Sequence, residues 1–414
     1  MSNTQLLPRH MQSALATAMA DTPVVCLLGP RQSGKSTLAR QFDPKRAYFT
    51  FDDPALLQTA VMDPLGFIAS LPERVTLDEI QRVPPLLPAI KLSVDRDRRP
   101  GRFLLTGSAN LLLLPQVSES LAGRMEIVRL HPLTEAEIEQ KPGRFLRLLL
   151  EGGLKLQASP APVDPLDLVR RVVRGGYPEV IRSRSAARLR QWHRGYLDAL
   201  IQRDVADVAK LRDLDQLRRL LEVLAMQNAS LLNISSLSKH LGMRHETVEN
   251  HLVALELLFL VRRLPAWHRN EARRLVKAPK MHVLDSGLAA TLAGLGNSDW
   301  VEHRERFGHL LESFVIQQLI AQAGWTDPDL RFWHYRDKDQ VEVDLIITRG
   351  RETWGVEIKA ASTVAPSDGL GLRRLAEQCG KDFRGGVLFY AGVGTLPAAV
   401  PHCLAVSLDQ LWKQ

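Results

Sequence analysis

The chain has 414 residues, of which 45% are hydrophobic and 24% are charged, and this ordinary globular composition excludes wholesale disorder. At roughly 150 residues per domain, the length predicts two or three domains. The three cysteines, Cys26, Cys379 and Cys403, lie far apart in the sequence, which argues against a disulfide framework and against a cysteine-based zinc site.

The net charge of +8 is unevenly distributed along the chain. Residues 1–150 carry +3, residues 151–300 carry +7 and residues 301–414 carry −2. The basic excess in the middle predicts either a surface for phosphate backbones or a solvated helical face, and charge alone leaves both open.

The sequence contains no pattern typical of a secreted or membrane protein. The N-terminal residues lack a basic segment followed by an apolar core, as a secretory signal would have. The most apolar stretch, residues 252–261, is too short to span a membrane and contains Glu256. We therefore expect a cytoplasmic protein with no membrane partner.

The first predicted element is a short apolar segment, residues 23–28, which is typical of a buried parallel strand. It leads into a complete GxxxxGK[ST] pattern and then a helical pattern, through Gly29, Pro30, Arg31, Gln32, Ser33, Gly34, Lys35, Ser36 and Thr37. The glycines permit a tight loop whose amide groups point at phosphates, next to a helix N-terminus. The pattern therefore predicts an ATP site in which Lys35 reaches the β- and γ-phosphates and Ser36 ligates Mg²⁺.

The second predicted strand, residues 74–79, ends in the carboxylates Asp78 and Glu79. Asp78 is expected to hold the Mg²⁺, and Glu79 is expected to orient and deprotonate the attacking water. An acidic strand end is common by itself. After a complete phosphate loop, it predicts the metal ligand and the general base of an ATPase.

The third predicted strand, residues 102–108, ends in polar side chains. Thr106, Ser108 and Asn110 are candidates for sensing the γ-phosphate or positioning the water, and the sequence does not choose among them; we include Ser108 in the nucleotide site. Arg124 is a candidate arginine finger, supplied to a neighbouring subunit if the chains form a ring. A surface arginine is the alternative.

These segments, with the wording GPRQSGKST, VTLDEIQ, LLTGSAN and LAGR, resemble the AAA+ branch of P-loop ATPases. In particular they resemble one prokaryotic family whose ATPase core is followed by a domain of unknown function. The resemblance implies an α/β domain over residues 1–140, with a parallel sheet flanked by helices. It also implies a nucleotide-driven machine or switch that binds ATP and Mg²⁺ and hydrolyses ATP.

Residues 140–165 are rich in proline and glycine, which predicts a loop or a domain boundary. The segment GGYPE (175–179) matches a motif of the same family, and a tight structural turn is its default interpretation. Helical periodicity then runs through Tyr196 and Leu200, and again through Leu217 and Leu224.

Residues 233–242 predict a short amphipathic helix that ends at a glycine, and residues 248–259 predict a longer second helix. Extended segments follow at 261–267 and 280–284. This order is typical of a winged helix-turn-helix, so we expect residues 165–300 to form a helical region that contains one, with DNA as a candidate partner through residues 233–284.

The charges on these elements leave the partner open. The second helix offers Arg244, His245, Thr247 and Asn250, but also Glu246 and Glu249, which would repel phosphates. The remaining basic side chains fall on the predicted wing, at Arg262, Arg263, Arg269, Arg273 and Arg274. A winged helix can also dock a protein, so a protein partner is the alternative to DNA.

The last third of the chain places carboxylates where packed surfaces are expected. Residues 308–320 predict a helix on which Glu312 shares a face with apolar residues, so it needs a cation or a lysine as partner. The predicted strands 340–347 and 354–360 alternate so that Asp344, Glu357 and Lys359 meet if the strands are neighbours. Asp344 and Glu357 could then bind Mg²⁺, with Lys359 beside them.

This arrangement resembles the PD-(D/E)xK nuclease fold, which implies an α/β nuclease-like domain over residues 301–414 with Glu312, Asp344, Glu357 and Lys359 as its catalytic set. The alternative is a hairpin with a charged solvent face, which does not account for Glu312. Nuclease activity stays open, because the sequence has no Pro-Asp pair before Asp344 and this third is net acidic.

Together these patterns predict a Mg²⁺-dependent, ATP-hydrolysing protein that couples its nucleotide state to a DNA-directed activity. The alternative is an ATP-dependent switch that acts through a protein partner, with a catalytically inactive nuclease-like domain. A homo-oligomer is expected only through the AAA+ resemblance and Arg124.

Overall fold

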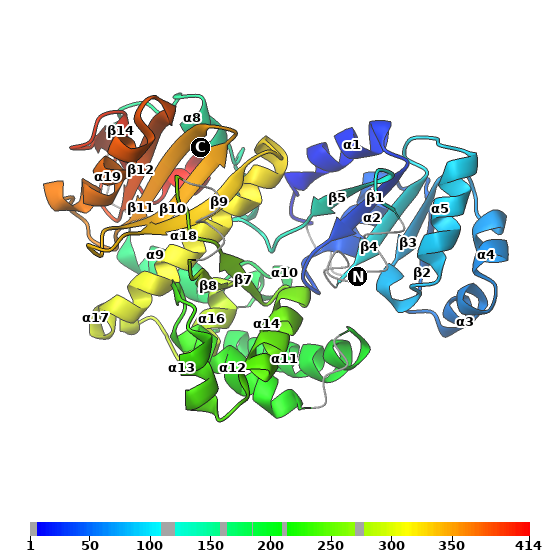
Figure 1. Ribbon diagram of the computed structural model, residues 1–414. Helices are drawn as coiled ribbons and strands as arrows, with labels where there is room; N and C mark the ends of the chain where they lie inside the picture. The colour runs from blue at the N-terminus through cyan, green and yellow to red at the C-terminus, as the bar shows by residue number, and fades with distance from the viewer. Residues whose placement is uncertain (1–5, 109–120, 158–163, 184, 209–212, 270–276) are drawn as a thin grey trace.

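The structure, a computed structural model, describes residues 6–108, 121–157, 164–183, 185–208, 213–269 and 277–414. An N-terminal α/β part, a helical middle part and a C-terminal α/β part follow one another along the chain (Figure 1). Among the described residues, no helix has the length and apolar character needed to cross a membrane. All three cysteines are free thiols.

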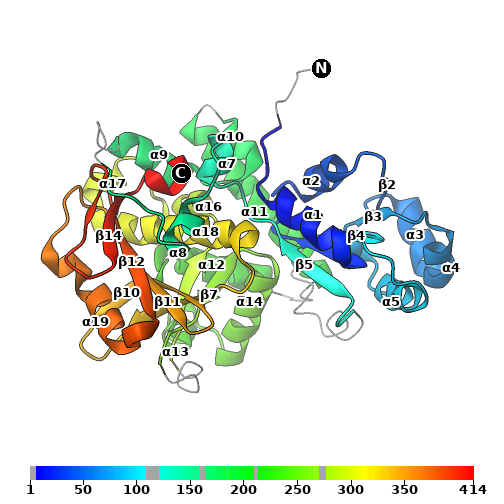
Figure 2. The same ribbon diagram turned by 90° about the horizontal axis from the view of Figure 1, so that it is seen from above.

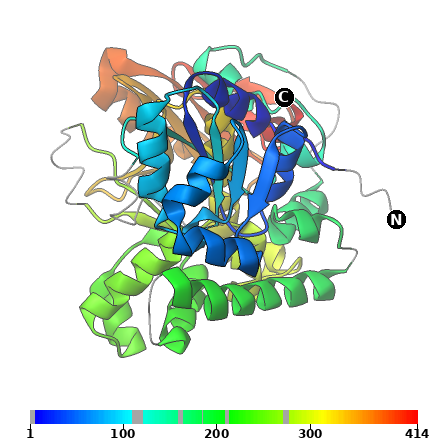
Figure 3. The same cartoon turned by 90° about the vertical axis from the view of Figure 1, so that its right-hand side faces the viewer.

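The N-terminal part is built on a parallel five-stranded sheet in the order β2-β3-β4-β1-β5 (Figure 1). Figure 3 shows this part, in blue and cyan, in front of the rest of the molecule. Its strands are β1 (Val24–Leu28), β2 (Ala47–Thr50), β3 (Val75–Asp78), β4 (Phe103–Gly107) and β5 (Met125–Arg129). The helical segments around it are α1 (Met11–Asp21), α2 (Lys35–Phe42), α3 (Pro54–Met62), α4 (Pro64–Ser70), η1 (Ile80–Arg82), α5 (Leu86–Arg96) and α7 (Glu135–Ile138). The three strands predicted from the sequence are confirmed as β1, β3 and β4.

Both faces of this sheet are covered, which explains why β1 is apolar throughout. Val25 and Leu27 pack in one cluster with side chains of α1 and α2. Val24 and Cys26 point to the opposite face, as alternation along a strand requires, and pack with side chains of α4 and α5. Because apolar side chains cover both faces, polar side chains can gather at the carboxyl ends of β1 and β3.

The middle part consists of helices and a small antiparallel sheet in the order β6-β8-β7. Its helices are α9 (Pro165–Arg174), α10 (Pro178–Ile181), α11 (Ala186–Val208), α12 (Leu214–Met226), α13 (Ile234–Leu241), α14 (His245–Leu257), α16 (Ser286–Ala293) and α17 (Asp299–Glu302). Its strands are β6 (Ser230–Leu231), β7 (Val261–Leu264) and β8 (Lys280–Val283). The helices predicted around 233–242 and 248–259 are confirmed as α13 and α14, but Phe259 lies beyond the end of α14 with a positive φ of 56°.

The C-terminal part is a mixed six-stranded sheet in the order β13-β14-β12-β11-β10-β9. Its strands are β9 (Arg331–Arg336), β10 (Glu342–Arg349), β11 (Glu352–Ile358), β12 (Phe383–Tyr390), β13 (Thr395–Pro397) and β14 (Cys403–Ser407). The helical segments are α18 (Arg304–Thr326), η3 (Pro366–Gly369), α19 (Leu370–Cys379), η4 (Gly380–Asp382) and α20 (Gln410–Lys413). The predicted neighbours β10 and β11 pair antiparallel, and α19 connects β11 to the parallel strand β12.

One continuous apolar cluster joins the middle and C-terminal parts. It includes Leu168 of α9, Leu220 of α12, Leu252 of α14, Phe314 of α18 and Val356 of β11. The helix α18 lies between the middle helices and the C-terminal sheet (Figure 2). The expected boundary between residues 300 and 301 therefore separates segments that share one core, and it stays a prediction.

The segment 140–165 was expected to be a loop, and this expectation is wrong in part. It contains α8 (Phe145–Leu150), whose Phe145 and Leu146 are fully buried in the shared cluster. The backbone N–H of Leu146 donates to Oε1 of Gln322 on α18 at 2.9 Å. Proline and glycine lie on both sides of this short helix, and their frequency in the segment therefore led to the prediction of a loop.

Candidate functional site

The predicted phosphate loop runs from the end of β1 to the start of α2. Gly34 caps α2 with a left-handed conformation, φ 98°, which favours glycine. A side chain at Gly29 would collide with the backbone of Leu130, so this position also needs a glycine. The loop thus brings backbone amides and a helix N-terminus to one edge of the sheet, as an anion site requires.

Lys35 lies in this loop with its side chain almost completely buried. Its ammonium donates to the carbonyl oxygens of Gly29 at 2.9 Å and Pro30 at 2.8 Å. These carbonyls hold the positive charge beside the anion cradle, where phosphate oxygens can replace them as partners.

Ser36 and Asp78 meet at the end of β3. The Ser36 hydroxyl lies 3.1 and 3.2 Å from the two carboxylate oxygens of Asp78. Asp78 also accepts hydrogen bonds from Tyr48, at 2.5 Å, and from Thr106. Hydroxyl and carboxylate oxygens are ligands that Mg²⁺ prefers. Ser36 and Asp78 therefore fit the Mg²⁺ ion that the phosphate loop implies.

Glu79 follows Asp78, and although its backbone N–H donates to the same Thr106 hydroxyl at 3.3 Å, its carboxylate has separate partners. Its backbone is left-handed, with φ 60°, and its carboxylate accepts from the Ser108 hydroxyl at 3.2 Å and from the side-chain amide of Gln81. The same amide donates to the Ser108 oxygen at 2.9 Å. Thr106 is thus associated with Asp78 and Ser108 with Glu79, whereas Asn110 lies outside the described residues.

Arg124 lies near the amino ends of the parallel strands, whereas the phosphate loop follows the carboxyl end of β1. It immediately precedes β5, whose first residue, Met125, aligns with Val24 at the start of β1. Its guanidinium pairs with Asp95 and donates to the carbonyl of Ala122 at 3.1 Å. Within its own chain Arg124 is therefore far from the loop, and a role in a neighbouring subunit stays a prediction.

Residues from outside the sheet contact the loop directly. Arg9 donates to the carbonyls of Ser33 and His131, both at 2.6 Å, and pairs with Glu137 at 3.1 Å. Tyr196 of α11 donates to the carbonyl of Arg31 at 3.3 Å. The middle part is thereby in hydrogen-bond contact with the phosphate loop.

The GGYPE motif connects Tyr196 to the core of the middle part. The Tyr177 and Tyr196 hydroxyls lie 3.1 Å apart, and both rings pack together. The Asp285 carboxylate accepts from the backbone N–H of Gly176 at 2.8 Å, and a side chain at Gly175 would collide with it. Burial raises the pKa of Asp285 to about 6. The motif is the structural turn that we expected, and it also positions a tyrosine beside the loop.

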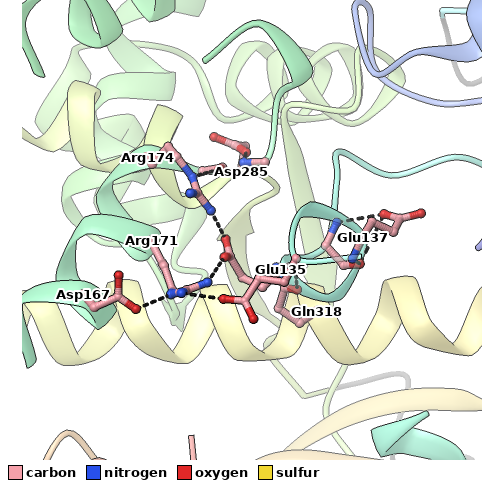
Figure 4. Close-up of polar contacts among 11 residues, drawn as sticks. Glu135, Glu137, Asp167, Arg171, Arg174, Asp285 and Gln318 are labelled. Atoms are coloured by element: carbon pink, nitrogen blue, oxygen red, sulfur yellow. Dashed lines mark hydrogen bonds and ion pairs between the residues drawn. The ribbon is translucent and has the colours of Figure 1, made fainter. Parts of the chain in front are cut away.

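A second joint lies around α7, where the N-terminal part meets α9 and α18 (Figure 4). The buried Glu135 carboxylate accepts from Arg171 at 2.7 Å and from Arg174. Its backbone N–H donates to Gln318 of α18 at 2.8 Å. Arg171 also pairs with Asp167 at 2.7 Å. These contacts anchor the segment after β5 to the shared core.

The predicted DNA-contacting residues divide into exposed and internal groups. Arg244, His245 and Asn250 are exposed at the start of α14, while Thr247 is half-buried.

Two of the five wing arginines have partners within the chain. Arg263 pairs with Glu249 at 3.4 Å and with Glu256 at 3.2 Å. Arg262 turns toward α18, where it donates to Gln317 at 2.9 Å, and burial lowers its pKa to about 10. Arg269 is exposed, and Arg273 and Arg274 lie outside the described residues. Arg262 and Arg263 thus have partners within the chain, and contact of the predicted wing with DNA stays a prediction.

Three carboxylates, two of them from the predicted set, surround a lysine of the middle part. Lys280 of β8 lies 2.9 Å from Glu312, 3.6 Å from Glu342 and 3.9 Å from Asp344, measured from Nζ to carboxylate oxygen. The other oxygen of Asp344 accepts from the backbone N–H of Ile358 at 2.8 Å. Lys280 is thus the partner that a buried Glu312 requires.

The charges in this cluster shift each other's pKa. Burial alone would lower the pKa of Lys280, but Glu312 and Asp344 outweigh it and raise the pKa above its usual value. Burial and the neighbouring Glu312 raise the pKa of Asp344 to about 6. Burial, followed by the repulsion of Asp344, holds the pKa of Glu357 well above its usual value.

These residues do not fit a divalent cation. Glu357 turns to Lys359, 3.5 Å away, and lies against Gly371 of α19. Among the residues that the structure describes, no group of three or more His, Cys, Asp or Glu side chains could hold a metal ion. The metal roles of Asp344 and Glu357 therefore stay predictions without geometric support.

Sequence reasoning missed five partners of the predicted site residues: Arg9, Tyr48, Gln81, Tyr196 as a loop contact, and Lys280. Only Gln81 had a local signal, because it follows Glu79 within the VTLDEIQ segment.

Comparison with known proteins agrees with the N-terminal site. An AAA domain family matches residues 21–139, and two families described as domains of unknown function, DUF8612 and DUF4143, match residues 166–299 and 307–408. The chain is 31% identical to the uncharacterized protein Rv2008c of Mycobacterium tuberculosis over 86% of its own length and 74% of that protein. It is 22% identical to the uncharacterized protein MJ1544 of Methanocaldococcus jannaschii over 78% of its length and 71% of that protein.

A Walker-type ATPase of Pyrococcus abyssi is 17% identical, with a TM-score of 0.42, and the match covers 70% of this chain and 97% of that one. A TM-score this low carries no argument. The AAA domain match contains the whole phosphate loop together with Asp78 and Glu79. The chain therefore belongs to the family of the mycobacterial protein Rv2008c and is a P-loop ATPase of the AAA type.

Proposed function

We propose that this ATPase couples its nucleotide state to a DNA-directed activity of the middle part, which we assign as a winged helix. The observation that carries the proposal is the hydrogen bond from Tyr196 of α11 to the carbonyl of Arg31 in the phosphate loop. Any change of the loop on binding or hydrolysis of ATP acts directly on a helix of the middle part.

The chemistry of hydrolysis divides among the residues at the end of the sheet. Lys35 would bind the β- and γ-phosphates, and Ser36 and Asp78 would hold Mg²⁺, which neutralises charge on the phosphate oxygens. Glu79, oriented by Ser108 and Gln81, accepts a proton from the attacking water. A ring of subunits that supplies Arg124 to a neighbour is part of the same proposal.

The order of elements supports the winged-helix assignment. The helices α12, α13 and α14 are interleaved with the sheet β6-β8-β7, in which β7 and β8 form the antiparallel pair after the longer helix. The exposed Arg244, His245 and Asn250 lie at the start of α14, where such a helix meets DNA. Glu249 is paired with Arg263, which reduces the negative charge that this helix would present to DNA.

A coupled assay tests this function. ATP hydrolysis is measured with and without duplex DNA between about 50 and 200 mM salt, where a protein with several phosphate contacts loses affinity steeply. DNA should stimulate hydrolysis at low salt, and Arg244→Ala with His245→Ala should reduce the stimulation. Arg188→Ala, an exposed arginine on α11, is the matched control. Hydrolysis that is indifferent to DNA at every salt concentration would contradict the DNA-directed part.

A second candidate is a nucleotide switch that docks a protein partner, with a catalytically inactive nuclease-like domain. The position of Lys280 among the C-terminal carboxylates favours it. The succession of α18, β9, β10, β11, α19 and β12 supports the nuclease-like fold, which we propose as a fold alone. ATP hydrolysis that responds to a protein partner and not to DNA would support this candidate.

A further inference from the structure

A cluster of ion pairs lies where β10 begins and β11 ends. Lys280 is only 3% exposed, and its ammonium lies within 4 Å of carboxylate oxygens of Glu312, Glu342 and Asp344. The strand β8 that carries Lys280 belongs to the middle part, whereas the three carboxylates belong to α18 and β10. A cation from one part of the molecule thus occupies the centre of an acidic cluster in another.

The remaining carboxylates have their own cations. Arg336 lies 2.8 Å from the other oxygen of Glu342, and Lys359 lies 3.5 Å from Glu357. Four carboxylates therefore face the three cations Lys280, Arg336 and Lys359, which leaves a net charge of only about −1 before His309, 3.9 Å from Glu312, is considered. A divalent cation needs more uncompensated negative charge than this, and it would lie beside the buried ammonium.

We infer that Lys280 replaces the divalent cation in this nuclease-like fold, so that Glu312, Glu342 and Asp344 form a metal-free joint between the middle and C-terminal parts. The joint connects β8 to α18 and to β10 through the ion pairs of Lys280. In this state the C-terminal part cannot assemble a metal-dependent hydrolytic centre. The inference rests on the proposed nuclease-like fold, and it concerns a site separate from the ATP site and from the DNA-directed function.

Mn²⁺ binding to the nucleotide-free, full-length protein tests the joint, with electron paramagnetic resonance reporting bound ion. Asp344→Asn should bind as much Mn²⁺ as the wild type does. Lys280→Met keeps the length of the side chain and removes its charge, so it should create one Mn²⁺ site. The double variant Lys280→Met with Asp344→Asn should lose that site, which assigns it to this cluster.

Two outcomes would overturn the inference. One is Mn²⁺ binding by the wild type that disappears in Asp344→Asn, because the carboxylates would then hold a metal beside Lys280. The other is a folded Lys280→Met variant that gains no site, because Lys280 would not be what excludes the ion. The comparison of wild type with Asp344→Asn remains decisive if Lys280→Met fails to fold, as unpaired buried carboxylates can cause. Neither outcome bears on ATP hydrolysis, which is measured separately.

Discussion

Asp78 and Glu79 are neighbours in the sequence, yet they contact different partners. The Asp78 carboxylate accepts hydrogen bonds from Ser36, Tyr48 and Thr106, which hold it beside the start of α2. The Glu79 carboxylate accepts hydrogen bonds from Ser108 and Gln81. The left-handed backbone at Glu79 turns the second carboxylate away from the first, so the two can perform separate tasks.

Glu79→Gln keeps the shape of the side chain and removes its basicity. We expect hydrolysis to fall by about two to three orders of magnitude while ATP binding is retained, because a general base typically contributes about 10² to 10⁴ in rate. Nucleotide affinity and turnover measured on the same preparation check this. Unchanged turnover would mean that another group activates the water.

Three buried histidines make stability depend on pH. Burial lowers the pKa of His193 to about 4, of His282 to about 3 and of His334 to about 4. The unfolded chain takes up these protons below about pH 6.5, while the folded chain does not. The stabilisation is therefore complete above pH 6.5 and is lost progressively as the pH falls toward 4.

The free energy of unfolding should decrease by up to about 1.4 kcal/mol per pH unit for each of these histidines over that window. Urea titrations between pH 7.5 and 4.5 measure it. His193→Asn, which keeps a polar group near Thr291, should make the slope shallower by one proton. A slope that is the same in the variant would show that His193 titrates alike in both states.

At the residue scale, the sequence was informative where the site is local. Lys35, Ser36, Asp78 and Glu79 stand in two short motifs whose spacing already predicts their chemistry. Lys280 could not be found in this way, because it reaches Glu312 only through the packing of β8 on α18. The need for a cation beside Glu312 was predictable, but its identity was not.

At the scale of elements, periodicity predicted the long and the fully buried segments. The strands β1, β3 and β4 and the helices α11 to α14 follow directly from their apolar patterns. The short helix α8 did not, because tertiary contacts such as the one between Leu146 and Gln322 stabilise it. The edge strand β9 was not predicted, although two of its residues, His334 and Tyr335, are buried.

The helix α11 should transmit the state of the phosphate loop. Tyr196→Phe removes the hydrogen bond to Arg31 and keeps the ring that stacks on Trp192. One hydrogen bond contributes about 0.5 to 1.5 kcal/mol, so we expect a change of about 2- to 10-fold in ATP affinity or in its response to DNA. Fluorescent nucleotide titration measures it. The control variant Arg188→Ala, at an exposed residue of the same helix, should change neither quantity. If Tyr196→Phe also changes neither, α11 does not transmit the nucleotide state.

At the scale of the whole molecule, the two apolar clusters of the N-terminal sheet include few side chains from elsewhere, such as Phe259 and Leu284, whereas the middle and C-terminal parts share one large cluster. Calorimetry should therefore resolve two unfolding transitions. ADP with Mg²⁺ at 100 times its dissociation constant should stabilise the N-terminal transition by about 2.7 kcal/mol and leave the other nearly unchanged. One transition that ignores nucleotide would contradict this division.

The central claim is that Lys35, Ser36, Asp78 and Glu79 form an ATP-hydrolysing site. Release of phosphate from ATP by purified full-length protein tests it most directly, with Lys35→Ala as the inactive variant and the exposed Lys45→Ala as its matched control. We predict Mg²⁺-dependent hydrolysis in the wild type and in Lys45→Ala, and loss to background in Lys35→Ala, because the phosphates lose their buried ammonium. Hydrolysis that persists in Lys35→Ala would contradict the account.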